Sequence, residues 1–108
     1  MRAEQLIAQI ERRLAGEPVS VEPFARLASP PAFDAKGLAR LTRFAHREVD
    51  GLLGLLDASD DGVRHAVAYL LGRAADPRAV DPLFALTVAP RDWLDADYAL
   101  EALGALGD

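Results

Sequence analysis

Three short segments of this chain repeat one pattern at nearly regular intervals. VEPFARL at 21–27, VDGLLGL at 49–55 and VDPLFAL at 80–86 each begin with valine and an acid, continue with proline or glycine, and end on leucine. Self-similarity with a period of about 20–50 residues is typical of repeat proteins, in which each unit buries its apolar face against the next one. The sequence therefore predicts a stack of about three similar units.

Each repeat predicts a pair of helices. An acid follows each initial valine by 12 or 13 residues, at Asp34, Asp61 and Asp92, and a longer apolar-periodic stretch follows each acid. Aspartate is a favoured N-cap because its carboxylate accepts hydrogen bonds from free backbone N–H groups. Pro23 and Pro82 suit the first turn of the shorter helices, where no intrahelical N–H is needed. We expect helices at 2–15, 20–28, 34–46, 48–57, 61–75, 79–88 and 93–107.

The expected fold class is all-α, because no segment shows the strict alternation of a hairpin strand. The predicted architecture is a right-handed α-solenoid of about three helical hairpins with an N-terminal capping helix. The whole chain, 1–108, is read as one domain, with the capping helix at 1–16 and repeats at 20–46, 48–75 and 79–107. A content of 51% apolar and 27% charged residues suits such a globular chain.

The second half of the chain resembles the HEAT repeat in its short bacterial form, which also occurs in phycobilin lyases. The resemblance rests on Asp-x-Val-Arg at 61–64, Leu-Gly at 71–72 and Asp-Pro-Arg-Ala-Val-Asp-Pro-Leu at 76–83. ALEALGALGD at 99–108 repeats the Leu-Gly ending. The resemblance is strong over 48–108 and weaker over 20–47. It implies HEAT-like hairpins that bind other proteins on the surface of their second helices, and it implies no particular chemistry.

The composition of the chain argues against several classes of function. The net charge of −5 opposes general binding of nucleic-acid backbones, which normally requires a basic protein. The absence of cysteine excludes disulfides, thiolate metal sites and a cysteine nucleophile. The longest uncharged stretch, 82–90, is nine residues long, so no membrane span is expected. The N-terminus is charged throughout and does not resemble a signal peptide, so a cytoplasmic location is expected.

Charged side chains on the longer helices form the candidate partner-binding surface. Projection at 100° per residue places four basic residues of the helix at 34–46 on one stripe, and the next long helix adds further exposed candidates. The last helix is acidic on its polar side, so this surface would grade from basic to acidic along the stack. The alternatives are an ordinary solvated face and a contact with a nucleic-acid backbone. The predicted contacts are Lys36, Arg40, Arg43, Arg47, Arg64, His65, Tyr69 and Arg73.

The last helix also carries a candidate self-association surface. Terminal repeats are normally polar on their outer side, whereas apolar residues here surround most of the helix. A patch of this kind would join copies of the chain or would be covered by further sequence. The alternative is that an alanine-rich helix looks apolar on any projection. The candidate residues are Trp93, Leu100, Leu103 and Leu106.

No catalytic residue, metal ligand or cofactor is expected. The segment 57–62 begins like a calcium loop, but its twelfth position holds Ala68 instead of glutamate. Asp61 and His65 have helical ligand spacing without an obvious third ligand, so His65 is expected at the surface. The expected function is non-catalytic protein–protein interaction, as an adaptor or scaffold, with an acidic protein partner. The alternatives are a lyase-like or other accessory subunit of an enzyme, and nucleic-acid binding through the basic stripe.

Overall fold

The computed structural model describes residues 3–18, 33–58 and 60–107. Their regular secondary structure is helical throughout, without a strand in these ranges. The predicted helix at 20–28 lies outside the described residues. The other six predicted helices are present, with ends within about two residues of the expected ones. They are α1 (Ala3–Leu14), α3 (Ala35–Arg47), α4 (Val49–Leu55), α5 (Asp61–Ala74), α6 (Val80–Val88) and α7 (Trp93–Ala105), with a 3₁₀ turn at Pro77–Ala79.

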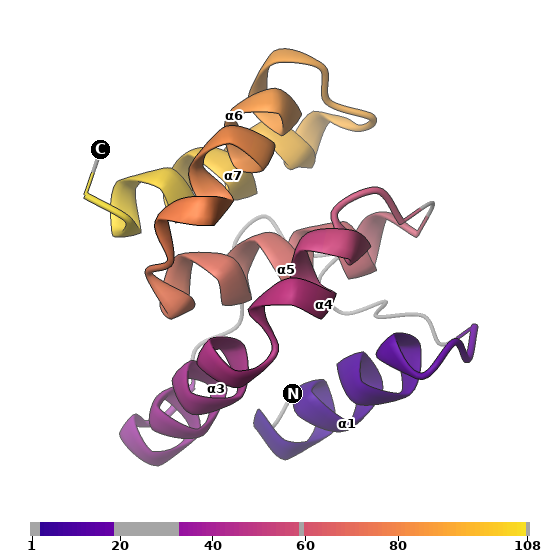
Figure 1. Cartoon of the computed structure of the whole chain (residues 1–108), viewed down its shortest axis with the longest axis vertical. Helices are drawn as coiled ribbons and strands as arrows, with labels where there is room; N and C mark the ends of the chain where they lie inside the picture. Colours follow the sequence, from indigo (N-terminus) through magenta and orange to yellow (C-terminus); the bar gives the residue numbers. More distant parts are fainter. Residues whose placement is uncertain (1–2, 19–32, 59, 108) are drawn as a thin grey trace.

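The helices stack as an all-α solenoid. The long helices α1, α3, α5 and α7 pack in sequence order, and the short helices α4 and α6 lie in front of them in Figure 1. Contacts between successive long helices recur at one spacing: Arg73 reaches Thr42, and Arg64 reaches Asp95, each across 31 residues. This spacing matches the interval between the second and third copies of the repeated phrase. The repeat in the sequence is therefore a repeat in space.

Aspartate residues cap the N-termini of the long helices α3, α5 and α7. The cap of α5 is not the aspartate that the sequence predicted. Asp34 accepts a hydrogen bond from the amide of Gly37 at 2.7 Å, as a capping residue should. Asp60, and not the predicted Asp61, caps α5 and accepts from the Val63 amide at 3.1 Å. Asp61 is the first residue inside the helix and pairs with Arg64 instead. The sequence has two consecutive aspartates that could each cap the helix. Asp60 is the cap, and Asp61 forms the ion pair with Arg64.

The core runs through the stack as one continuous cluster. Helix α5 lies at its centre and packs against α3, α4 and α7, so eleven of its fourteen residues are buried. A helix with neighbours on three sides has little room for polar side chains at the surface. This burial determines which of the predicted contact residues on α5 a partner could reach. The large buried side chains of the core include Leu6, Ile10, Leu41, Phe44, Leu52, Leu70, Leu71 and Leu83.

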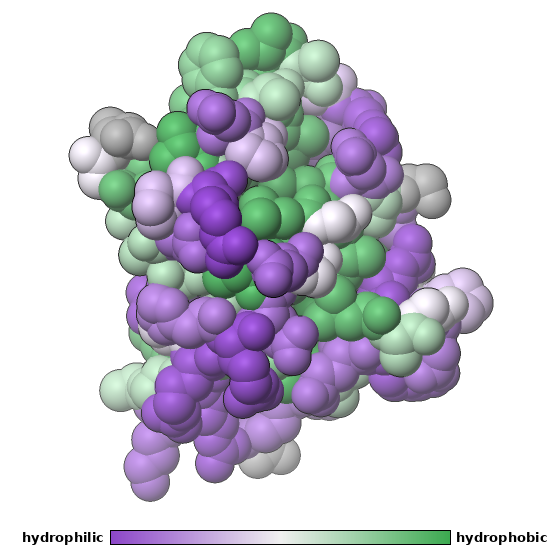
Figure 2. Space-filling view, viewed as in Figure 1, coloured by the Kyte–Doolittle hydropathy of each residue, from purple (hydrophilic) through white to green (hydrophobic). Residues whose placement is uncertain are grey.

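Two arginines tie the layer of short helices together. Arg78 donates to a carboxylate oxygen of Asp50 at 2.7 Å, near the start of α4. Arg91 donates to the backbone carbonyl of Asp57 at 2.7 Å, beyond the end of α4. Between these bridges lies a groove of about 450 Å³ between α4 and α6, and Figure 2 shows apolar surface on this face among charged side chains. None of the helices described above is both long enough and apolar enough to cross a bilayer.

Candidate functional site

The basic stripe predicted on α3 is exposed. Its four members follow one another at intervals of four, three and four residues, which places them on one side of the helix. The side chains lie beside α1, where Ile7 and Phe44 help to form a shallow depression of about 210 Å³. The stripe therefore borders the first helix of the stack. Its members are Lys36, Arg40, Arg43 and Arg47.

Two members of the stripe have partners within the chain. Arg40 forms an ion pair with Glu4 of α1. The guanidinium of Arg47 lies 3.8 Å from a carboxylate oxygen of Glu48 and 5.7 Å from the ring centroid of Phe44. Within the described ranges, no carboxylate pairs with Lys36 or Arg43. These two cations are the members of the stripe that a partner could neutralise without breaking an existing pair.

Arg64 and His65 are not surface residues, which corrects two of the predicted contacts. Arg64 is 1% exposed and His65 is 0% exposed. Both belong to the first turns of α5, and α7 covers this part of the helix. The projection of α5 alone could not show this, because the burial comes from the neighbouring hairpin. Both residues therefore leave the candidate binding surface.

The carboxylate of Asp95 on α7 accepts hydrogen bonds from both buried side chains, Arg64 and His65. It is 0% exposed, and it accepts from Arg64 Nε at 3.2 Å and from His65 Nε2 at 2.9 Å. It also accepts from the backbone amides of Arg91 at 2.8 Å and Asp92 at 3.2 Å. Burial by itself would raise the pKa of Asp95, but the hydrogen bond from the Arg91 amide and the charge of Arg64 outweigh it. They hold the pKa below its usual value.

The other donors of the cluster are also nearly all satisfied. Arg64 donates to the carbonyl oxygen of Ala58 at 2.8 Å and pairs with Asp61. His65 Nε2 lies 3.1 Å from Asp92 Oδ1 as well, and because both carboxylates accept, this nitrogen carries the hydrogen. His65 Nδ1 is buried and has no hydrogen-bond partner among the described residues. The result is a polar network that joins two consecutive hairpins.

The contacts of the network favour a structural role over a metal or catalytic one. Ligand atoms of His65, Asp92 and Asp95 lie within 4.8 Å of one another, which meets the spacing of a three-residue cation site. The guanidinium of Arg64 already supplies the positive charge there, and backbone amides occupy further lone pairs of Asp95. Arg64, His65 and Asp95 are also buried, which leaves little room for a substrate beside them. The arrangement can hold α5 against α7, and this is the chemistry that its contacts support.

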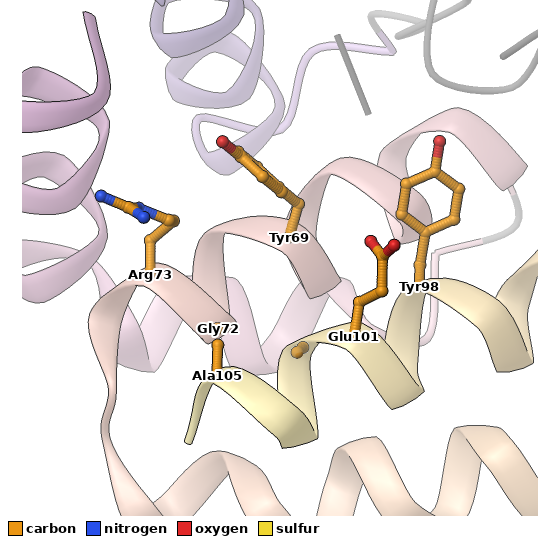
Figure 3. A pocket seen from close by; sticks show the side chains of 7 residues that line it. Tyr69, Gly72, Arg73, Tyr98, Glu101 and Ala105 are labelled. Atoms are coloured by element: carbon orange, nitrogen blue, oxygen red, sulfur yellow. The ribbon is translucent and has the colours of Figure 1, made fainter. Parts of the chain in front are cut away.

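Tyr69 and Arg73 remain near the surface and line a pocket that the sequence did not predict. The pocket lies between α5 and α7 and has a volume of about 180 Å³. In Figure 3 the side chains of Tyr69 and Arg73 rise from α5, and those of Tyr98 and Glu101 rise from α7 on the same side. Its lining residues are Tyr69, Gly72, Arg73, Tyr98, Glu101, Ala102 and Ala105.

The two tyrosines are held in the walls of this pocket. Tyr98 is 3% exposed, and its ring stacks on His65 with a centroid distance of 4.7 Å and an interplanar angle of 11°. The ring of Tyr69 lies 6.1 Å from that of Phe33. Burial raises the pKa of the Tyr69 hydroxyl, with Arg73 lowering it and Glu101 raising it to lesser extents. The charges of Arg73 and Glu101 therefore both act at the mouth of the pocket.

A comparison with protein families identifies the unit at the centre of the stack. Residues 63–83 match the PBS lyase HEAT-like repeat. The chain contains a HEAT-like repeat. The match runs through α5 and the 3₁₀ turn and enters α6. A comparison with curated proteins finds no significant match.

The HEAT-like repeat contributes one wall of the pocket between α5 and α7, which we call the tyrosine pocket. It also contributes Arg64 and His65 to the buried network around Asp95. Tyr69 and Arg73 belong to the repeat, whereas Asp95 and Glu101 come from the helix stacked on it. Sequence reasoning did not identify Asp95. The spacing of Asp92 and Asp95 was the available signal, because two acids three residues apart at a helix start form a capping box.

The predicted self-association residues lie beyond the HEAT-like repeat, on α7. Leu100 is exposed, with 59% of its surface accessible. Leu103 and Leu106 are half-buried and pack against the core. The side chain of Trp93 lies outside the described part of the chain. Two further apolar side chains are exposed on α6, namely Phe84 at 60% and Val88 at 68%.

Proposed function

We propose that this chain is a non-catalytic protein-interaction module that acts as an adaptor or scaffold. It would bind its partner on the side of the long helices that carries the basic stripe and the tyrosine pocket. The buried polar residues are engaged in the stack itself, so recognition falls to the exposed charges. HEAT-like repeats stack into extended surfaces of this kind.

The charge distribution supports a partner with acidic residues. The four cations of α3 lie at one end of the surface, and the exposed acids Asp97 and Glu101 lie on α7 at the other. Complementary charge steers encounters and fixes the orientation of a partner more than it adds affinity. An acidic segment would therefore dock over α3 and be repelled from α7.

The observation that carries this proposal is the exposure of Lys36 and Arg43 without a carboxylate partner in the described part of the chain. A protein that needed these charges only for solubility could pair them locally, as it pairs Arg40 with Glu4. An incoming carboxylate can pair with either one at no cost to the fold. These two residues are consequently the best places to test the surface.

Charge reversal at these positions tests the function. A partner captured from the source cells would be purified and titrated calorimetrically against three proteins: wild type, the double variant Lys36→Glu/Arg43→Glu, and the control Arg12→Glu/Arg13→Glu. The control makes the same change in net charge on α1, outside the stripe. We expect the first variant to bind about tenfold or more weakly and the control to bind within about twofold of wild type. Equal affinity of all three proteins would refute the proposed surface.

A nucleic-acid partner is the second candidate, since the stripe favours phosphates as well as carboxylates. Binding to duplex DNA would be measured at low and at moderate ionic strength. A phosphate-binding stripe predicts affinity that falls steeply with salt and that disappears in Lys36→Glu/Arg43→Glu. Absence of binding at low salt would remove this candidate.

A further inference from the structure

The tyrosine pocket owes its depth to small residues on both helices. Gly72 of α5 packs directly on Ala102 of α7, and a Cβ atom at Gly72 would lie only 2.9 Å from Ala102 Cα. The two backbones therefore approach closely at this point, and the larger side chains of Tyr69 and Tyr98, about one turn earlier on α5 and α7, line the pocket beside the contact. Small residues form the floor and aromatic rings form the walls.

The size of the pocket indicates the kind of group that fits it. Its volume of about 180 Å³ lies below the roughly 300 Å³ at which typical small-molecule sites begin. It is comparable to the ~150 Å³ protein cavity that accommodates one benzene molecule. One aromatic or large aliphatic side chain is the natural occupant, as for an anchor residue that a partner inserts at an interface.

The rim of the pocket is charged with opposite signs on its two helices. Arg73 belongs to α5, and its Nε donates to Thr42 of α3 at 3.2 Å, so it lies on the α3 side of the pocket. Glu101 belongs to α7 and is exposed. Carboxylates of a bound peptide would therefore be favoured on the α3 side of the anchor, and cationic groups on the α7 side.

We infer that the tyrosine pocket binds one large apolar side chain of a partner peptide that carries acidic residues on one side of this anchor and basic residues on the other. The inference rests on the proposed function and specifies the partner segment that the surface accepts. The acidic flank lies across Arg73 toward α3, and the basic flank lies against Glu101. Opposite charges on the two flanks distinguish this ligand from a uniformly acidic one.

The test uses synthetic peptides and amide chemical shifts in two-dimensional NMR spectra of the full chain. Four peptides of equal length would be titrated: acid–Phe–base, acid–Phe–acid, base–Phe–base and acid–Ala–base. We expect the first to bind tightest and to shift the amides of Tyr69, Gly72 and Ala102, with replacement of its phenylalanine by alanine weakening binding about tenfold. Equal affinities for the phenylalanine and alanine peptides would overturn the inference, and so would the absence of shifts at these three amides.

Two variants, Ala105→Phe and Glu101→Lys, test the pocket without changing the contact between Gly72 and Ala102. Ala85→Phe is the control for the first of them. Ala105→Phe fills the pocket from its exposed rim, and Ala85→Phe makes the same change at an exposed position of α6, in the groove on the other layer. Ala105→Phe should abolish the preference for the phenylalanine peptide, whereas Ala85→Phe should retain it. Glu101→Lys should reverse the ranking in favour of acid–Phe–acid. An unchanged ranking in Ala105→Phe and Glu101→Lys would overturn the inference.

The results separate failure of this inference from failure of the proposed function. If the captured partner depends on Lys36 and Arg43 while Ala105→Phe binds it normally, the pocket is not the anchor site and the interaction module stands. If the partner binds Lys36→Glu/Arg43→Glu as tightly as wild type while the peptides bind in the pocket, the stripe is not the binding surface. The inference about the pocket is then still supported. Melting curves of all variants verify that each one is folded.

Discussion

At the scale of single residues, one buried carboxylate does most to join the last two hairpins. Asp95 receives an arginine, a histidine and two backbone amides, and no part of it is exposed. Removing one partner of a buried ion pair leaves an uncompensated charge, which costs far more than the pair itself contributes. The network is therefore sensitive to changes at Asp95, although Asp95 itself is fully buried.

Asp95→Asn should destabilise the protein and flatten its response to acid. We expect the variant to lose about 3 kcal/mol or more of unfolding free energy at neutral pH, measured by urea denaturation. The pKa of Asp95 lies below its unfolded value, so its contribution is present above about pH 4 and is lost as the pH falls through the folded pKa. The variant should therefore lose less stability than wild type below pH 4.

The matched control for this prediction is Asp97→Asn, two residues along the same helix and exposed. It should stay within about 0.5 kcal/mol of wild type at every pH, because exposed substitutions away from a network have small effects. If the two variants had the same stability, the network around Asp95 would contribute nothing measurable.

At the scale of elements, the contact between α5 and α7 depends on a missing side chain. Glycine is the poorest helix former apart from proline, yet Gly72 lies inside α5. The close approach of Ala102 explains it, because a methyl group there would meet backbone atoms of α7. Packing between helices has overridden helix propensity at this position, and the tyrosine pocket is a consequence.

Alanine substitutions at two glycines should consequently have opposite effects. Gly72→Ala should lower the free energy of unfolding by about 1–3 kcal/mol, since overpacking outweighs the gain in helix propensity. Gly104→Ala, in α7, has open space around the new methyl group and should raise the free energy of unfolding by up to about 1 kcal/mol. Thermal denaturation by circular dichroism compares the two. Stabilisation by both substitutions would show that the helices are not in close contact at Gly72.

At the scale of the whole molecule, the stack differs between its middle and its last hairpin. Helix α5 is covered on both sides by other long helices, whereas α6 and α7 expose three large apolar side chains. Exposed apolar side chains that lie near one another are typical of surfaces that another protein surface covers. We propose self-association through α7, with Leu100 as its most exposed apolar residue.

Leu100→Glu tests this self-association. The apparent mass of the wild-type protein, measured by light scattering, should rise with concentration. The mass of the variant should remain that of one chain, because the substitution places a charge in the contact. The exposed-to-exposed substitution Ala39→Glu on α3 serves as the control and should behave as wild type. A wild-type protein that remains a single chain at all concentrations would exclude the proposed contact.

The sequence by itself determined the local features of this protein. Turn residues, caps and apolar periodicity are short-range signals, so they predicted the described helices and the exposed stripe from Lys36 to Arg47. The 31-residue interval between the last two copies of the repeated phrase also equals the spacing of two contacts between successive long helices. The prediction of Asp61 as the cap of α5 was wrong, because Asp60 caps the helix and Asp61 forms an ion pair with Arg64 instead.

Only the tertiary structure decided which polar side chains face solvent. Arg64 and Arg73 of α5 are both predicted contact residues, yet one is buried against Asp95 and the other is exposed beside Tyr69. The difference depends on how far α7 overlaps α5, which is a property of the packed pair of helices and is absent from either helix alone. The tyrosine pocket has the same origin, since its two walls are about thirty residues apart in the chain and meet only where Gly72 allows the backbones to touch.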